Sequence, residues 1–295
     1  MIKISRLAHV VLETPDLAQQ VDHYTRVLGL QVTDRDTTTA YLSCSTDHHT
    51  VVLKQGQNHQ CTGIGLQVPN GTDLNAYAAQ IESHGIKAER LSHCQPAIAD
   101  MVAFADNKGT RIEVFSEAQP SSLGFSKTGI SPNKIGHLAF NVIDAPATVK
   151  FYCDVLGFRV SDWMGDFFAF LRCGPDHHSI NLVAGKKTKM HHIAFELRDW
   201  THIRDSSDML AMDKIPLIWG PVRHGIGHNI STYHRSSDGH IIELFCELDR
   251  INDEGLGHFE PRRVHQTFPQ KPDVWSNIGL AANMWGTPPP DGFLD

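Results

Sequence analysis

The segments LAHVVLETPDLAQQVDHYTRVLGLQV (residues 7–32) and IGHLAFNVIDAPATVKFYCDVLGFRV (residues 135–160) decide the fold, because the second repeats the first. His9 and His137 occupy matching places in the two segments, and an aspartate, a tyrosine and a glycine that follow them match at the same offset. In both segments a short apolar run leads through an acidic turn into about a dozen residues of helical pattern that end at the glycine. The pattern predicts a strand followed by a helix in each copy.

Two further blocks repeat in the same order. TDHHTVVL (46–53) matches PDHHSINL (175–182), and DNKGTRIEVF (106–115) matches SSDGHIIELF (236–245). Because the offset between matching positions stays almost constant along the chain, the two halves arose by duplication. A second strand–helix unit begins inside each half, at GIGLQV and at HHIAFEL.

We therefore predict an α+β fold of two tandem domains, each made of two paired βαβββ modules that close into an open barrel. Pairing is expected because a one-sided sheet must bury its apolar face. The segment between the halves is polar and contains proline, glycine and serine, which is typical of a linker. The predicted boundaries are an N-terminal non-catalytic domain at 1–117, a linker at 118–133, a C-terminal catalytic domain at 134–247 and an irregular tail over the second domain at 248–295.

The composition is that of an ordinary globular protein, with 41% hydrophobic and 20% charged residues in a chain of 295. The net charge of −7, with scattered lysine and arginine, argues against nucleic acid or an anionic membrane as the main partner. The start of the chain lacks the apolar core of a signal peptide, and no run has the length of a membrane span. The six cysteines show no CxxC spacing, so we expect reduced thiols in a cytoplasmic protein.

The adjacent histidines in KMHHIAFELRD (189–199) raise the question of which one carries a function. The alternation of apolar and polar residues after them predicts a half-buried strand, in which neighbouring side chains point to opposite faces. His192 then points away from the apolar face, into the concave side of the sheet. His191 shares the apolar face with Ile193 and is expected to be a packing or rim residue.

The same alternation places two other side chains on the concave side. His137 in GHLAFNV and Glu243 in GHIIELF both point away from their apolar neighbours. Two imidazoles and one carboxylate from different strands make a 2-His-1-carboxylate set, which leaves one side of a metal open and suits non-haem Fe(II). The ligand types do not exclude Mn(II). We predict a metal site at His137, His192 and Glu243.

The first half offers only part of this set. His9 and Glu113 stand where the second half has His137 and Glu243. Gly63 stands at the position of His192, so one ligand is missing. We therefore expect the first half to bind no metal.

The most specific block of the chain is GPVRHGIGHNISTYHRSSDGHIIELF (220–245). It resembles the signature of the type I extradiol ring-cleavage dioxygenases of the vicinal oxygen chelate superfamily, in which a histidine, a tyrosine and an acidic–glycine turn precede a metal-binding glutamate. The spacings from His224 and from Tyr233 to Glu243 fit this signature. Ser237 stands where the family often has proline, and turns tolerate serine. The resemblance extends from residue 5 to about residue 250.

The resemblance implies an enzyme of aromatic-compound degradation that uses Fe(II) and inserts both atoms of its co-substrate O2 into a catechol by meta cleavage. It implies the same metal ligands, with His224 and Tyr233 hydrogen-bonded to the substrate oxygen. It also assigns the general acid/base to the His177/His178 pair, and the family's loop length favours His178. Such enzymes are usually homo-oligomers.

Several alternatives remain open at this stage. A metal-dependent isomerase or lyase related to glyoxalase, or a metal-free ligand-binding protein of the bleomycin-resistance type, would use the same fold. The substrate is open between monocyclic catechols, dihydroxybiphenyls and carboxylated catechols. Phe168 and Phe170 either line the pocket or belong to the core. Three further histidines are expected at the rim or in solvent: His228, His234 and His240.

Overall fold

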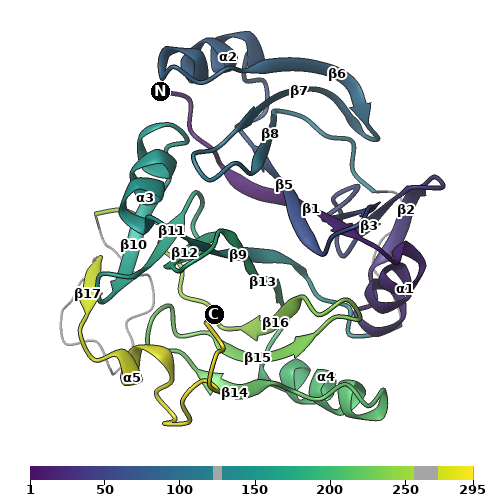
Figure 1. The fold of residues 1–295 in the computed structure, drawn as a ribbon, viewed down its shortest axis with the longest axis vertical. Coiled ribbons are helices and arrows are strands. Elements are labelled where there is room, and N and C mark those ends of the chain that lie inside the picture. Colours follow the sequence, from purple (N-terminus) through teal and green to yellow (C-terminus); the bar gives the residue numbers. More distant parts are fainter. Residues whose placement is uncertain (122–127, 256–271, 295) are drawn as a thin grey trace.

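Each half of the chain folds as two βαβββ modules (Figure 1). The computed structural model describes residues 1–121, 128–255 and 272–294. The first half contains β1 (Arg6–Thr14), α1 (Leu17–Asp22), the π-helix η1 (His23–Val27), β2 (Gln31–Arg35), β3 (Thr39–Ser43), β4 (Val51–Gln55), β5 (Gln60–Gln67), α2 (Leu74–Ser83), β6 (Glu89–Gln95), β7 (Ile98–Ala105) and β8 (Arg111–Phe115).

The second half repeats this order and adds two short elements from the tail. It contains β9 (Lys134–Val142), α3 (Ala145–Asp154), β10 (Arg159–Met164), β11 (Phe168–Arg172), β12 (Ile180–Ala184), β13 (Lys189–Glu196), α4 (Trp200–Met212), β14 (Trp219–Arg223), β15 (Ile230–Arg235), β16 (Ile241–Cys246), β17 (Asp273–Trp275) and α5 (Ile278–Ala282).

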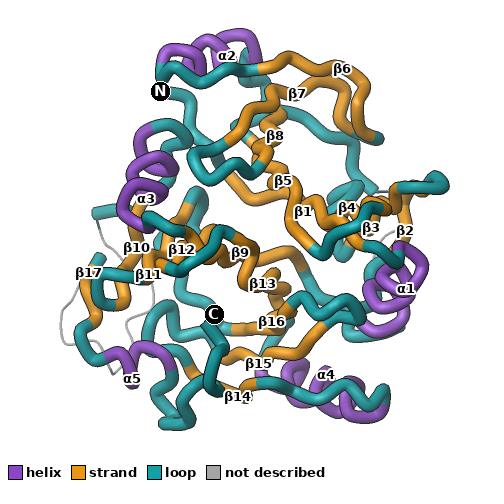
Figure 2. Tube along the Cα trace, viewed as in Figure 1, coloured by secondary structure: helices purple, strands orange, loops and turns teal. Residues whose placement is uncertain are grey.

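The two sheets have the same topology. The first has the order β2-β3-β4-β1-β5-β8-β7-β6, and the second has the order β14-β15-β16-β13-β9-β12-β11-β10-β17. In each half the first strands of the two modules pair antiparallel at the centre, β1 with β5 and β9 with β13. Strands fill the middle of the molecule and helices lie at its outside (Figure 2). The predicted α+β fold of paired βαβββ modules is confirmed.

The first helix of each half begins and ends as the repeated sequence predicts. Asp16 and Asp144 cap these helices, because their side chains accept hydrogen bonds from the backbone N–H groups of Gln19 and Ala147. Gly29 and Gly157 follow the helices with φ of 78° and 76°, a conformation that glycine adopts without strain. In the first half the α-helix continues as a π-helical turn, so the predicted regular helix is shorter than expected.

One continuous apolar core joins the two halves. Tyr24 beside α1 packs against Phe195 of β13 with ring centroids 6.4 Å apart. From the other side, the hydroxyl of Tyr152 on α3 donates to Asp106 of the first half at 2.9 Å. Side chains of both halves therefore contribute to one shared core between them.

The tail is more ordered than predicted where it is described. β17 pairs in parallel with β10 and extends the second sheet, and α5 follows it. Residues 256–271 of the predicted tail and 122–127 of the predicted linker lie outside the described residues. The bounds of the four predicted segments stay predictions.

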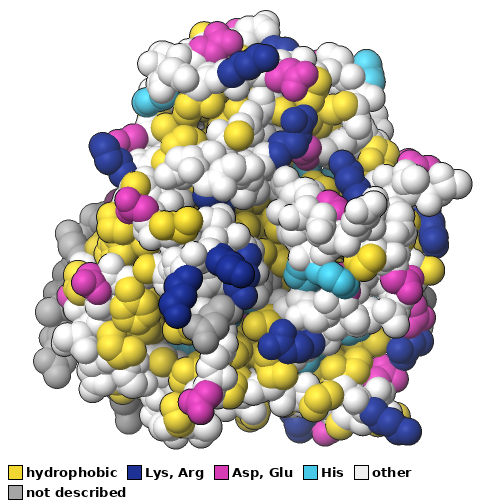
Figure 3. Space-filling view, viewed as in Figure 1, with side chains coloured by type: hydrophobic (Ala, Val, Ile, Leu, Met, Phe, Trp, Pro, Cys, Tyr) yellow, Lys and Arg dark blue, Asp and Glu magenta, His cyan; other side chains and the backbone are white. Residues whose placement is uncertain are grey.

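The surface agrees with the charge pattern of the sequence. Figure 3 shows basic and acidic side chains interspersed over one face of the molecule. Within the described ranges, no helix is both long enough and apolar enough to cross a membrane. All six cysteines are free thiols, and three of them are buried.

Candidate metal centre

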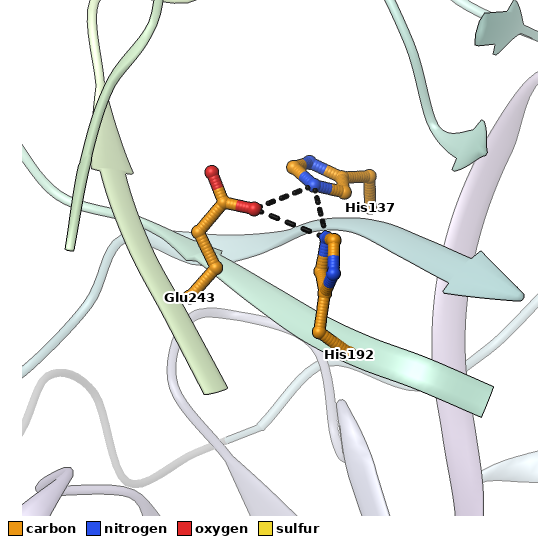
Figure 4. Close-up of side chains that lie close together, drawn as sticks. All are labelled: His137, His192 and Glu243. Atoms are coloured by element: carbon orange, nitrogen blue, oxygen red, sulfur yellow. Dashed lines mark hydrogen bonds and ion pairs between the residues drawn. The ribbon is translucent and has the colours of Figure 1, made fainter. Parts of the chain in front are cut away.

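Three buried side chains of the second half converge on one point (Figure 4). The Nε2 atom of His137 lies 3.1 Å from Nε2 of His192 and 3.0 Å from Oε2 of Glu243. The Nε2 atom of His192 lies 3.1 Å from the same carboxylate oxygen. Of the residues that the structure describes, only these three form a group of potential metal ligands this close together. The structure thus brings together the three residues that the sequence predicts.

The register of the central strands produces this convergence. Ala194 of β13 lies opposite His137 of β9 on one side and opposite Glu243 of β16 on the other. His192 lies two residues before Ala194 on the same face and pairs with Ala139. The small alanine side chains leave space above the sheet, so the three longer side chains meet over it.

The electrostatics of this cluster favour a bound cation. Burial lowers the pKa of His137, although the neighbouring Glu243 opposes this shift. Burial alone would raise the pKa of Glu243, but His137 and His192 beside it hold that pKa well below its usual range. The site is therefore a buried carboxylate beside two buried imidazoles. A buried negative charge is costly unless it is paired, and a divalent metal held by two nitrogens and one oxygen would pair it.

Two residues that the sequence interpretation missed hold the carboxylate in place. The Oε1 atom of Glu243 accepts hydrogen bonds from Nδ2 of Asn229 at 3.0 Å and from Oγ of Ser231 at 2.6 Å. The other carboxylate oxygen is left to face the two histidines. Ser231 and Tyr233 are two residues apart in β15, so their side chains point to the same face of the strand. The alternation of the strand could therefore have placed Ser231 beside Glu243.

The prediction that strand alternation separates His191 from His192 is wrong. The register between β13 and β9 shifts between Met190 and His192, which makes His191 the extra residue of a β-bulge. Both imidazoles therefore face the cavity side, with their Nδ1 atoms 2.6 Å apart. The Nε2 atom of His191 lies 2.5 Å from the backbone oxygen of Phe293 in the tail.

These contacts determine which ring nitrogens of His191 and His192 carry a proton when His192 binds a metal through Nε2. With Nε2 of His192 directed at the metal position, its Nδ1–H donates to Nδ1 of His191. The Nε2–H of His191 then donates to the carbonyl of Phe293. An outer hydrogen bond of this kind orients a ligand histidine and selects its tautomer.

His177 and His178 occupy different places relative to the cavity. His178 lines the cavity, and its ring centroid lies 4.4 Å from that of His137. His177 lies behind it, with the two Nδ1 atoms 2.9 Å apart and its Nε2 3.3 Å from Oδ2 of Asp162. Burial and the nearby His137 and His177 lower the pKa of His178 well below its usual range. His178 therefore faces the cavity, and His177 and Asp162 lie behind it.

His224 and Tyr233 form a second pair beside the metal position. Nε2 of His224 lies 2.8 Å from the hydroxyl of Tyr233, and its Nδ1 lies 2.6 Å from the backbone oxygen of Ala282. Because the carbonyl can only accept, Nδ1–H of His224 donates to it and the neutral Nε2 accepts from Tyr233. Burial, followed by the charge of Glu243, raises the pKa of Tyr233 well above its usual range.

One cavity of about 590 Å³ is bounded by β11, β14–β16 and the tail. The three candidate metal ligands line it together with His178, His191, His224 and Tyr233. Phe168 and Phe170 line this cavity, with their ring centroids 4.5 Å apart. The interpretation that these two residues line the pocket is confirmed. The expectation of rim or solvent positions is wrong for His228 and His234, which are buried away from the cavity. His240 is half-buried.

The first half holds a related but incomplete cluster. Nε2 of His9 lies 3.1 Å from Oε2 of Glu113, as in the second half. Gly63 pairs with Arg111 of β8 in the way that His192 pairs with Ile241 of β16, so the two positions correspond.

Comparison with known proteins agrees with this architecture. Residues 6–114 and 134–244 match the family model of the Glyoxalase/Bleomycin resistance protein/Dioxygenase superfamily. The chain is similar to a metapyrocatechase of Pseudomonas sp. (strain CF600), with 26% identity across 83% of this chain and 87% of the relative. It is also similar to a 2,2',3-trihydroxybiphenyl dioxygenase of Sphingomonas paucimobilis, with 29% identity across 94% of this chain and 98% of the relative.

A solved structure shares the whole fold. The Mn(II)-bound glyoxalase from Novosphingobium aromaticivorans superimposes with a TM-score of 0.85 at 26% identity, covering 98% of this chain and 94% of that one. Because the matched segments span both βαβββ pairs and most of the chain, the protein belongs to the Glyoxalase/Bleomycin resistance protein/Dioxygenase superfamily.

Proposed function

We propose that this protein is a metal-dependent extradiol dioxygenase, which inserts both atoms of O2 into a catechol ring with meta cleavage. The observation that carries the proposal is the convergence of His137, His192 and Glu243 in one cavity. Three ligands on one side of a metal leave the opposite side for substrate and O2. The similarity to relatives named metapyrocatechase and trihydroxybiphenyl dioxygenase supports the same reaction class.

We propose Fe(II) as the metal, because two histidines and one carboxylate with open positions are the usual ligand set of non-haem Fe(II) oxygenases. When bound, Fe(II) would hold the two hydroxyls of a catechol next to O2 and allow electrons to pass between them. Mn(II) is the alternative that the reconstitution experiment below separates.

His178 is the proposed general acid/base of the reaction. It lies in the cavity beside His137, and its Nδ1 is engaged with His177, so its remaining nitrogen is available to a substrate oxygen. A positioned histidine of this kind takes a proton from one oxygen and returns it to another.

His224 and Tyr233 are the proposed partners of the substrate hydroxyl that carries negative charge. Their mutual hydrogen bond and the contact of His224 with Ala282 fix both groups before substrate enters. In the free site the Tyr233 O–H donates to Nε2 of His224, and it would turn to the substrate oxygen when substrate binds. A donor that is held in place in a buried site stabilises developing charge more strongly than water does.

The test is reconstitution of the metal-free protein under anaerobic conditions with Fe(II) or Mn(II), followed by a panel of catechols and admission of O2. We expect Fe(II) to restore stoichiometric O2 uptake and a yellow ring-opened product, and His192→Ala to show neither. A metal-loaded protein that takes up no O2 with any catechol, but isomerises a thiol adduct of methylglyoxal, would contradict the proposal. So would a protein that binds no metal.

A further inference from the structure

The cavity contains almost no charge besides the metal site. Among the described residues that line it there is no lysine, arginine or aspartate. Its one carboxylate belongs to Glu243, which faces His137 and His192. A carboxylate on the substrate would therefore be buried without a cation to pair with it, and burying an unpaired charge is strongly unfavourable.

Most of the rest of the wall is apolar or aromatic, and apart from the histidines its other polar residues are uncharged asparagines and a threonine. On one side a cluster forms around Phe170, with Phe168 stacked on it and with Met164 and Ile226 in contact. On the other side Trp219 stacks against Tyr233 at 5.3 Å. Aromatic rings bury large areas and prefer to pack against other rings. The volume of about 590 Å³ lies within the range of pockets for drug-sized ligands, so it accommodates more than a single catechol ring.

The tail closes this apolar chamber. Leu280 and Phe293 line the cavity, although they lie outside both pairs of βαβββ modules. The tail is attached by backbone hydrogen bonds, from the N–H of Gly225 to Ala281 and from the N–H of Met284 to Arg223. An apolar wall that is already in place loses little entropy when a ligand binds.

We propose that the substrate is an uncharged catechol that carries a bulky apolar substituent, such as an aryl group, and not a catechol that carries a carboxylate. This inference rests on the proposed dioxygenase function and narrows it. The apolar chamber receives the substituent, while the metal position and His178 receive the two hydroxyls.

The test compares 3-phenylcatechol, catechol and 3,4-dihydroxyphenylacetate with the Fe(II)-loaded protein. We expect kcat/KM for 3-phenylcatechol to exceed that for the carboxylated compound at least about a hundredfold, because the carboxylate is buried unpaired. Anaerobic titration, which needs no turnover, should give the same order of Kd. If the loaded protein cleaves none of the three compounds, the proposed function fails. If it prefers the carboxylated catechol, the function stands and this inference is overturned.

Two variants test the role of the wall. Leu280→Arg supplies a cation at the chamber, so the preference for 3-phenylcatechol over the carboxylated compound should fall at least about tenfold. Ile143→Arg is the matched control, because Ile143 is 73% exposed and does not line the cavity. An unchanged preference in Leu280→Arg, or an equal loss in Ile143→Arg, would contradict the assignment of the wall.

Discussion

The two halves of this protein have the same fold, and each has a buried glutamate at the equivalent position, but the glutamates have different hydrogen-bond partners. Glu113 and Glu243 occupy equivalent strands, and a histidine nitrogen lies 3.1 Å and 3.0 Å from them respectively. In the first half Nε of Arg111 donates to Oε1 of Glu113 at 3.0 Å, and Nε2 of Gln95 donates to Oε2 at 2.6 Å. The protein thus supplies its own cation to this carboxylate.

In the second half no lysine or arginine pairs with Glu243 among the described residues. Its Oε1 is held by Asn229 and Ser231, and its Oε2 faces two histidines. The two clusters therefore differ in two respects. Only the second has a third potential ligand, and only the second has a carboxylate that no lysine or arginine of the described residues contacts.

The largest expected effect is the loss of metal from the second half alone. His192→Ala removes one of three ligands, so we expect the purified variant to contain no stoichiometric metal and to show no dioxygenase activity. Metal content measured by elemental analysis checks this. The counterpart Glu113→Gln changes the equivalent cluster in the first half, and we expect full metal content. Loss of metal from Glu113→Gln would break the comparison, because it would give the first half a metal role.

The second effect separates catalysis from metal binding. His178→Gln should lower kcat about 10²- to 10⁴-fold, the usual contribution of a general acid/base, and should leave the metal content unchanged. Its counterpart is His49→Gln, because His49 lies beside His9 with ring centroids 4.7 Å apart, as His178 lies beside His137. We expect His49→Gln to keep its kcat. Equal losses of kcat in both variants would point to a stability effect and contradict the role of His178.

The duplication and the strand alternation predicted the centre of the site but not its surroundings. Alternation places His137, His192 and Glu243 on one face because it depends only on local backbone geometry. The register also confirms that Gly63 corresponds to His192. These features repeat in the sequence, so a single chain was enough to recognise them.

The position of His191 could not be predicted in this way. A β-bulge adds one residue to a strand without a signature in apolar alternation, and it places two neighbours on one side. The contacts of His191 with Phe293 and of His224 with Ala282 join residues far apart in the chain. Their partners lie in a tail whose sequence has no helical or strand periodicity strong enough to place it.

A third, smaller effect tests the hydrogen bond that the bulge creates. His191→Phe removes the acceptor of the His192 Nδ1–H, so we expect metal affinity to fall about 10- to 100-fold. Titration of the metal-free protein with Fe(II) measures this directly. His191→Asn, whose side-chain oxygen can accept the same hydrogen bond, should recover part of the affinity. If His191→Phe binds metal as tightly as the wild type, the contact has no positioning role.

The smallest expected effect on metal binding comes from restoring the missing ligand in the first half. The Cβ of a new side chain at Gly63 would lie 3.2 Å from Cγ2 of Val11, so Gly63→His should lower the free energy of unfolding by about 1–3 kcal/mol, as measured by denaturant titration. We expect this variant to bind no second equivalent of metal, because Arg111 and Gln95 still donate hydrogen bonds to the two carboxylate oxygens of Glu113.

Adding Arg111→Ile to this variant reproduces the residue at Ile241 and frees one oxygen of Glu113. The double variant should then bind a second equivalent, more weakly than the native site, because Gln95 still donates to Oε2 of Glu113, the oxygen that faces His9. A second equivalent in Gly63→His alone would mean that the missing ligand is the whole difference between the halves, and that the internal cation is not part of it.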